Sequence, residues 1–481
     1  MFLTFMFAGV HAQPNLAFYP FNNQFNSFDY NPAFLTSREK FTFSIFPLGG
    51  TNIGTNNQKI IKDLASKLLH GNLPDMEFSN VLSSLVNMSS FHQNIESSLL
   101  SITYRSEIGF FNFRIKDSEY FLASLNGDIT KFIFNDNVNS VVIGQPQYLP
   151  IQAVHYREYS LGYSFKSRSK RFSAGIRAKM YYGKSAVFSN ISGSIQADPA
   201  APANYLFKSS GTINLSLPKG IVNKSNTQLN TINLSRSTIF NCLFNTGNPG
   251  MGVDLGINYN IMPDLSFSIS VIDLGKINWK TNLYTMNNNI TYPLPPSIIP
   301  PAIGAVPVIT KPPYYTYTDL FNFGDLNSST VKFSKPLPAT IYSGLKYQVN
   351  PLFSMGIADR LVVVKDLSYN SVSLTGKLNV NKTLSISSGY SIIGDSYLNI
   401  PLAFLFQEKF GQFFIGTDNL TTILLPNYSQ FAGISFGACF YLFTQRNKYL
   451  KPSNLTLFYK LRKIIKNRQT GLTIKANQEY N

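Results

Sequence analysis

The sequence predicts an all-β protein: a transmembrane antiparallel β-barrel of about 14 strands, within a range of about 12 to 18. Three features lead to this prediction. Apolar and polar side chains alternate with a period of two, charged residues are scarce while aromatic residues are abundant, and short turns alternate with long connections. The barrel is expected to span residues 13–445 as one domain.

The alternation is clearest around the turn Met262-Pro263-Asp264. Every second residue is apolar in 253–261 and again in 265–271, and the residues between them are mainly Ser, Asn, Gly and Asp. Such a period indicates strands with one apolar and one polar face. Repeated over many hairpins, it favours a barrel with its apolar face in lipid and its polar face in the lumen. A soluble β-sandwich or solenoid is the alternative, but its strands would need a shared dry core.

Composition agrees with a membrane barrel. Charged residues make up 14% of the 481 residues, and there are 40 Phe and 27 Tyr. Soluble proteins usually carry about 25% charged residues, whereas outer-membrane barrels have aromatic girdles. No run reaches the roughly 18 apolar residues of a membrane helix.

The N-terminus predicts export to a bacterial outer membrane. An apolar stretch, Leu3 to Val10, precedes the small-residue pattern Val10-His11-Ala12, so residues 1–12 resemble a signal peptide. Its positively charged start is missing, which suggests a start codon assigned too late. A buried N-terminal strand is the alternative.

Helical spacing interrupts the strand pattern at 58–88. Apolar residues recur at helical intervals in Gln58–Leu69 and again from Phe78 to Leu85. We expect a helical hatch in the lumen or a capping loop, with an exposed loop as the alternative. The segment Tyr30 to Phe34 reads as a turn before the first strand, Phe41 to Pro47.

Strands and turns then follow in order. Leu99 to Ile129 predicts three strands, joined by turns at 105–107 and 116–119. Further short turns are expected at 166–170, 260–264, 349–351, 379–382 and 407–411, and long connections at 217–249 and 284–329. This asymmetry is typical of periplasmic turns and external loops. The strand count loses its parity near 184–195, which indicates one strand missed or one too many there.

The connection 284–329 is rich in proline, which excludes a regular ladder and favours polyproline II. The prolines are Pro293, Pro295, Pro296, Pro300, Pro301, Pro307, Pro312 and Pro313. We interpret this connection either as a lid or recognition surface, or as a variable external loop.

Alternation also assigns charged residues to the lumen. The candidates are Glu158, Arg177, Lys179, Asp254, Lys346, Arg360 and Lys377. An excess of inward cations would favour anionic solutes, whereas a pair such as Glu158–Arg177 would only fill the lumen. Cys439 is expected to face the lumen, and its spacing does not support a disulfide with Cys242.

The tail 446–481 is basic and is expected on the periplasmic side. Leu457, Leu461, Ile464 and Ile465 have helical spacing, which predicts a membrane- or partner-binding helix. Its basic candidates are Lys460, Arg462, Lys463, Lys466 and Arg468. A solvated disordered tail is the alternative.

Catalytic chemistry finds no support. The chain shows no Ser/His/Asp set, no clustered carboxylates and no Gly-rich phosphate loop, and His70, His92 and His155 are isolated. We expect a non-enzyme without cofactor or metal.

Several short segments carry a family resemblance. They are 156–163 (YREYSLGY), 175–179 (GIRAK), 253–256 (VDLG), 272–275 (IDLG) with Trp279-Lys280, and 336–338 (PLP) with Tyr342. Over roughly 28–443 they resemble an uncharacterised outer-membrane barrel family of Bacteroidota-type bacteria, a domain of unknown function distantly similar to FadL-like fatty-acid transporters. The Pro-rich segment and the tail depart from that pattern, and fold does not fix function.

These features predict a passive channel or transporter for small apolar or amphiphilic solutes. The alternative is a scaffold subunit of an envelope secretion or surface-assembly complex. The expected partners are outer-membrane lipid, an amphiphilic solute and envelope proteins, with no nucleic acid.

Overall fold

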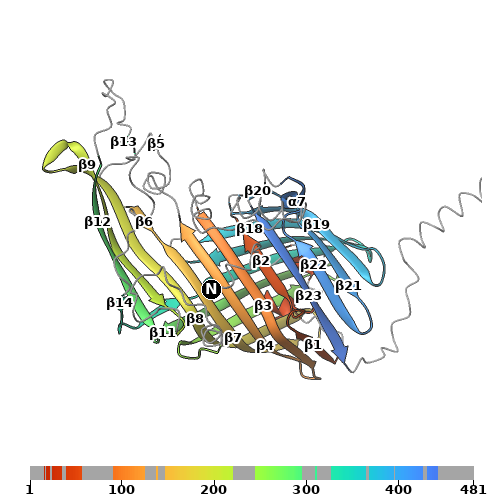
Figure 1. Ribbon diagram of the computed structural model, residues 1–481. Helices are drawn as coiled ribbons and strands as arrows, with labels where there is room; N and C mark the ends of the chain where they lie inside the picture. The colour runs from red at the N-terminus through yellow and green to blue at the C-terminus, as the bar shows by residue number, and fades with distance from the viewer. Residues whose placement is uncertain are drawn as a thin grey trace, which may run out of the picture.

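The computed structural model shows a closed antiparallel β-barrel (Figure 1). It describes residues 16–442 except 17, 22–23, 35–39, 57–89, 125–136, 139–146, 220–243, 295–308, 311–326, 365–367, 395, 426–428 and 430. The described residues form a ring of 14 strands, which confirms the predicted fold class. In ring order these are β1 with β2 (Phe41–Ile45, Thr51–Thr55), β3 (Ser90–Arg105), β4 (Phe110–Ser124), β7 (Ile151–Lys166), β8 (Phe172–Asp198), β10 (Pro249–Asn260), β11 (Leu265–Trp279), β16 (Ala339–Gln348), β17 (Phe353–Val363), β18 (Tyr369–Asn379), β19 (Leu384–Ile393), β21 (Leu402–Gln407), β22 (Gly411–Thr417) and β23 (Ala432–Leu442).

The ring closes at the C-terminal strand. β23 pairs with β22 on one side and with β1 and β2 on the other, and both of these short strands pair with β3. β1 and β2 therefore share one position in the ring. Closure leaves the ring of 14 strands without a free edge, so the backbone groups of neighbouring strands satisfy one another.

The other elements are short or lie outside the ring. They are η1 (Tyr19–Phe21), η2 (Ser27–Asp29), β5 (Asn137–Val138), β6 (Gln147–Leu149), β9 (Ala201–Ser216), β12 (Leu283–Leu294), β13 (Ile309–Thr310), β14 (Asn327–Ser328), β15 (Phe333–Pro336), β20 (Ser396–Asn399) and α7 (Thr421–Leu424). No helix among the described residues is both long and apolar enough to cross a membrane.

The apolar face of the wall points outward. On β10, Leu255, Ile257 and Tyr259 are exposed, whereas Asp254, which directly precedes Leu255, is fully buried. The same contrast holds on β17, where Ile357 is exposed and Ala358 is buried. The alternation therefore reports an apolar outer surface and a filled interior.

Short turns gather at one end of the barrel, which we call the turn end; the other end is the loop end. The turns expected at 105–107, 166–170, 260–264, 349–351, 379–382 and 407–411 all join neighbouring barrel strands. The turn expected at 116–119 is wrong, because β4 continues through it. Asp117, whose charge suggested a turn, instead accepts from Arg157 Nε of β7 at 2.6 Å.

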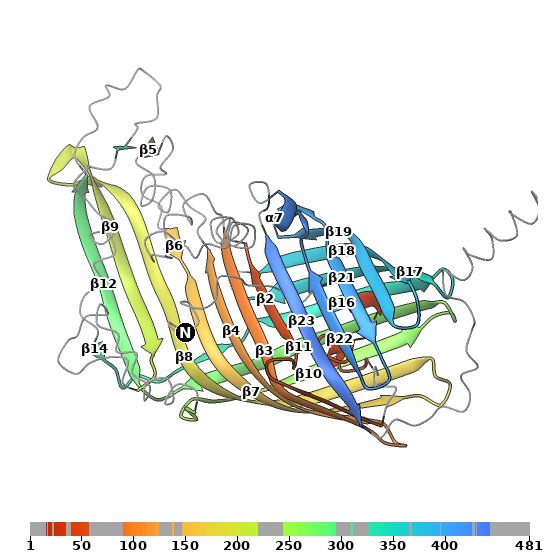
Figure 2. The ribbon, with the colours of Figure 1, turned by 45° about the vertical axis from the view of Figure 1, so that its right-hand side comes forward.

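One strand leaves the ring. β8 pairs with β10 up to Tyr182 and with β9 from Ala186 onward, and β9 in turn pairs with β12. β8, β9 and β12 thus rise beyond the ring at its loop end (Figures 1 and 2). This fork accounts for the lost parity near 184–195. The fork also corrects the predicted long connection 284–329. Its first part, 284–294, is a strand and forms most of β12, so the connection starts only after Leu294.

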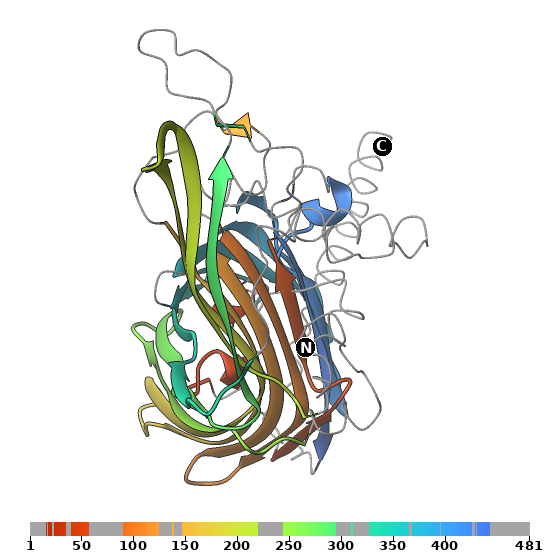
Figure 3. The same ribbon diagram turned by 60° about the vertical axis from the view of Figure 1, so that its left-hand side comes forward.

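The interior of the ring is occupied by the N-terminal segment, residues 16–34, which we call the plug. Figure 3 shows its short 3-10 turns inside the ring of strands. Its side chains Tyr19, Phe21, Phe28 and Phe34 are almost fully buried. The plug was expected to be only a turn before β1; the helical hatch expected at 58–88 lies outside the described residues.

Candidate functional site

Glycines of the wall form a cradle for the plug. A Cβ atom added at Gly175 would overlap the backbone of Pro32, and one added at Gly256 would overlap the side chain of Asn31. Gly344 and Gly356 of β16 and β17 likewise leave room for Tyr19 and Pro20. Only glycine permits so close an approach of two chain segments. The wall is therefore shaped to hold this segment.

Hydrogen bonds fix the plug in the cradle. Asn31 donates from Nδ2 to the carbonyls of Ile257 and Ile269, at 3.1 and 3.3 Å, and its Oδ1 accepts from the Ala33 amide at 2.9 Å. Ser270 Oγ donates to the Tyr30 carbonyl at 2.6 Å. The bonds to the Ala33 amide and the Tyr30 carbonyl satisfy buried backbone groups of a segment that has no ladder of its own.

Aromatic rings anchor the other half of the plug. Tyr19 stacks on Tyr342 of β16 with ring centroids 5.2 Å apart, and Phe18 meets Phe414 of β22 edge-on at 5.6 Å. Cys439 of β23 is buried in the cluster with Phe18 and Phe414, on the inward face that alternation predicts. Cys439 is a free thiol, and Cys242 lies outside the described residues.

On the loop-end side of the plug, a network of buried ion pairs crosses the lumen. Glu158 of β7 accepts from Arg114 at 2.8 Å and lies 3.3 Å from Lys179 Nζ. Lys179 also lies 2.9 Å from Asp254 and 2.7 Å from Asp273. Of these side chains, only those of Arg114, Lys179 and Asp273 have any exposed area. Charges this deep require partners, because an unpaired one would cost several kcal/mol.

The network also binds the plug. Arg177 donates to the Phe28 carbonyl at 2.5 Å and to Asp254 at 3.2 Å. Arg114 forms an ion pair with Asp29 of η2. The wall and the plug therefore share one set of charges, and the plug cannot leave without exposing or re-pairing them.

Four sequence-derived lumen candidates meet in this network: Glu158, Arg177, Lys179 and Asp254. Glu158 and Arg177 do not pair directly, but each contacts other members. The structure adds Arg114, Lys116, Asp273, Glu96 and Asp29. Arg114 and Lys116 were missed because the false turn at 116–119 broke the parity of β4. Asp29 was missed because the plug has no periodicity.

The other three candidates lie apart. Arg360 of β17 packs its guanidinium over Tyr342 and Tyr369, at 5.9 and 5.6 Å from the ring centroids. Lys377 of β18 lies 5.9 Å from the ring of Phe21 in the plug. Lys346 of β16 lines a cavity at the turn end. The tail candidates from Lys460 to Arg468 lie outside the described residues.

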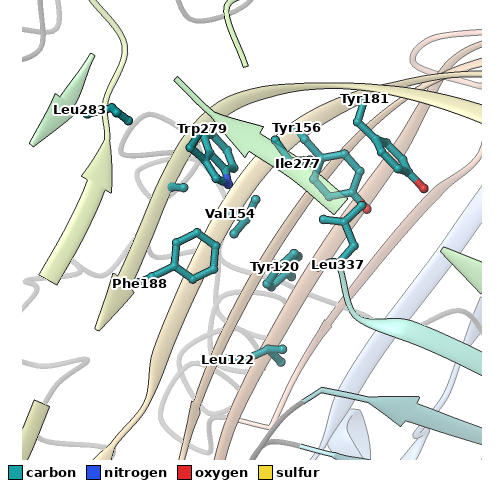
Figure 4. Close-up of a cluster of buried hydrophobic side chains, with 11 residues drawn as sticks. Tyr120, Leu122, Val154, Tyr156, Tyr181, Phe188, Ile277, Trp279, Leu283 and Leu337 are labelled. Atoms are coloured by element: carbon teal, nitrogen blue, oxygen red, sulfur yellow. The ribbon is translucent and has the colours of Figure 1, made fainter. Parts of the chain in front are cut away.

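At the loop end the inward face becomes aromatic. Figure 4 shows Tyr120, Tyr156, Tyr181, Phe188 and Trp279 in one buried cluster with neighbouring aliphatic side chains. The cluster joins β4, β7, β8 and β11 on the loop-end side of the ionic network. A buried apolar layer over buried charges shields the network from water.

Two cavities lie toward opposite ends of the barrel, and in the described part of the chain only the turn-end cavity has a plug residue in its lining. The loop-end cavity has about 50 Å³ and is lined by Tyr120, Tyr156, Arg360 and Tyr369 among others. The turn-end cavity has about 310 Å³, and the plug borders it at Ala33. The lumen is thus hollow but interrupted by the plug.

The chemistry of this interior is that of packing and pairing. Among the described residues, no three or more His, Cys, Asp or Glu side chains are arranged to hold a metal ion. The carboxylates of Glu158, Asp254 and Asp273 are instead bound to Lys and Arg.

Solved structures with a similar course of the chain include two toluene transporters. TodX of P. putida has 10% identity and a TM-score of 0.39, with 86% of this chain and 93% of that chain covered. TbuX of Ralstonia pickettii has 11% identity and a TM-score of 0.36, with 85% and 90% covered. These likenesses are remote, and the architecture is established by the strand pairing itself.

No curated protein matches the sequence. A family model does match, over residues 32–418, from the plug through β22. The matched range includes the plug residues Pro32 to Phe34 and most of the wall strands. The chain therefore belongs to a family of unknown function, DUF5723.

Proposed function

We propose that this protein is a gated channel or transporter of a bacterial outer membrane for small apolar or amphiphilic solutes. Residues 1–12 serve as its export signal, the short turns face the periplasm and the long loops face outward. Its gate is the plug. An enzymatic role is not part of this proposal.

One observation carries the proposal. The lumen is blocked by a separate chain segment seated in a glycine cradle, with a cavity toward each end of the barrel. A barrel that served only as an anchor would not need a hollow interior or a removable occlusion. Movement of the plug, with re-pairing of the ionic network that it shares with the wall, would open a path between the two cavities.

A disulfide between plug and wall tests the gate. A Cβ atom at Gly256 would lie 3.0 Å from Asn31 Cγ, which places the two Cβ atoms within about 4.5 Å, a distance that a disulfide spans. The variant carries Asn31→Cys and Gly256→Cys with Cys242→Ser and Cys439→Ala. Its parent with only the two native cysteines replaced is the control.

Both proteins are reconstituted in liposomes, and entry of hexanesulfonate is measured against protein-free liposomes. This amphiphile keeps its charge at every working pH and so crosses lipid slowly, whereas hexanol and hexanoic acid cross lipid unaided. We expect the oxidised pair to block entry and a reductant to restore it, while the control is insensitive to redox state. Equal entry in all forms would refute the plug as gate. No entry through any form, including one lacking residues 16–34, would refute transport.

The fork favours a second candidate function. β8, β9 and β12 project beyond the ring, where a partner protein could bind. A scaffold subunit of an envelope complex would use this extension. Purification from native membranes distinguishes the two: stoichiometric partner proteins support the scaffold, and bound solute without partners supports transport.

A further inference from the structure

The turn-end cavity differs in charge from the rest of the lumen. Its lining includes Lys166, Ser173, Asn258, Ser266, Lys346 and Gln348, all at the turn ends of wall strands. These strands, β7, β8, β10, β11 and β16, are consecutive in the ring. A lysine therefore stands at each end of a five-strand arc, with hydroxyl and amide groups between them.

Register places these groups within two residues of one level. Lys166 pairs with Ser173, and Ser173 pairs with Asn258. Two residues nearer the turn, Asn260 pairs with Ser266, and Ser266 pairs with Lys346. Inward side chains at neighbouring levels of a barrel converge on the same volume. The arc thus presents two ammonium groups and several neutral hydrogen-bond donors to a single cavity.

Within the part of the chain that the structure describes, Lys166 and Lys346 lack a nearby carboxylate, whereas the cations of the ionic network each have one. Arg114, Lys116, Arg177 and Lys179 each lie within 4.0 Å of a carboxylate. Among the described residues, no carboxylate lies that close to Lys166 or Lys346. Asp264 borders the cavity from the β10–β11 turn, but it is exposed and pairs with neither.

Lys346 is partly buried, so its missing counter-charge matters. An ammonium group withdrawn from water gains most from an anion that brings both charge and acceptor oxygens. A volume of about 310 Å³ is at the lower end of ligand pockets. It has room for an acid group and a short chain.

We propose that this cavity binds the acid group, carboxylate or phosphate, of an anionic amphiphilic solute. Lys346 and Lys166 supply the charge, and Ser173, Asn258 and Gln348 supply neutral contacts. This inference rests on the proposed transport function and makes it more specific. The solute's acid group meets the lysines on the turn-end side of the plug, beside Ala33.

Binding is tested on the full-length protein in a non-ionic detergent. Its lysines are reductively methylated with ¹³C, and the Lys166 and Lys346 resonances are assigned with K166M and K346M. Hexanoate, hexanol and inorganic phosphate are titrated separately. K382M, in the exposed β18–β19 turn, is the matched control.

We expect hexanoate to shift both resonances, K346M or K166M to weaken hexanoate binding at least tenfold, and K382M to leave it unchanged. Hexanol should shift neither resonance. Phosphate binding without hexanoate binding would support the anion site and assign it to free anions. Hexanoate binding that survives both substitutions, or no shift with either anion, would overturn the proposal.

The outcome separates this inference from the function beneath it. If solutes cross the liposome membrane but no anion binds, only the site is refuted. If hexanoate binds at Lys346 but nothing crosses, transport is refuted and the site remains. Because K346M could disturb folding, the exposed Lys166 provides a second variant, and heat-dependent gel migration verifies both.

Discussion

Gly175 of β8 lies directly against Pro32 of the plug, so close that a single added carbon would overlap the proline's backbone. The contact joins residues far apart in the sequence, and Ser164 of β7 donates a hydrogen bond to the same Pro32 carbonyl. Since backbone atoms cannot rotate away as a side chain can, this contact is a sensitive point of the proposed gate.

Gly175→Ala should therefore loosen the plug. The added methyl group meets backbone atoms of Pro32 and Ala33, and overpacking of this kind costs about 1–3 kcal/mol. We expect higher conductance in planar bilayers and lower thermal stability. Gly162→Ala is the matched control, because its new carbon would meet no atom closer than 3.7 Å. Equal conductance and equal thermal stability of the two variants would contradict the inference that glycines of the wall hold the plug.

Glu158→Gln should destabilise the folded barrel. It leaves Arg114 and Lys179 with one carboxylate fewer in a region closed to water. Breaking a buried ion pair by removing one partner costs about 3–5 kcal/mol. Urea unfolding followed by the fluorescence of Trp279 measures the loss. Glu408→Gln in the exposed β21–β22 turn should change stability by less than about 0.5 kcal/mol, and a similar loss in both would argue against the network.

Asp418 should make the stability depend on pH. It lies in the loop after β22, is buried, and its Oδ2 has no hydrogen-bond partner among the described residues. Burial raises the pKa of this carboxyl from its ordinary 3.8 to about 7, against the opposing effects of Arg360 and of a hydrogen bond from the Leu16 amide of the plug.

Because the folded protein binds this proton more tightly than the unfolded chain, the stabilisation is complete below pH 4 and is lost as the pH rises to about 7. The full effect is on the order of 4 kcal/mol, since each pKa unit corresponds to about 1.4 kcal/mol. Unfolding midpoints at pH 5 and pH 8 test this. Asp418→Asn should be nearly insensitive over that interval, and an unchanged pH profile would rule out Asp418 as the source.

Truncation at Gln445 should leave the barrel intact. β23 ends at Leu442, which pairs with Phe41 of β1, so the ring is closed before the tail begins. Heat-dependent gel migration should match that of the full chain. Binding to anionic vesicles should fall, because each basic residue near such a surface contributes about 1 kcal/mol. A truncated chain that fails to fold would show that the tail belongs to the barrel.

Sequence alone determined the wall. Its outward residues, such as Leu255 and Ile257, alternate strictly because a strand between an apolar exterior and a filled lumen has a period of two. Turns such as 260–264 could be located because they break this period over a few residues. These are local patterns, readable without knowing which strands are neighbours.

Tertiary structure decided what fills the wall. Residues 16–34 have no periodicity, and their partners Gly175, Gly256 and Tyr342 come from three separate strands, so no local pattern predicts a plug. The fork of β8 was likewise invisible, because an alternating strand looks the same whether its neighbour is β10 or β9. Alternation records the face on which a side chain lies, whereas only the closed ring decides which charges and rings meet within it.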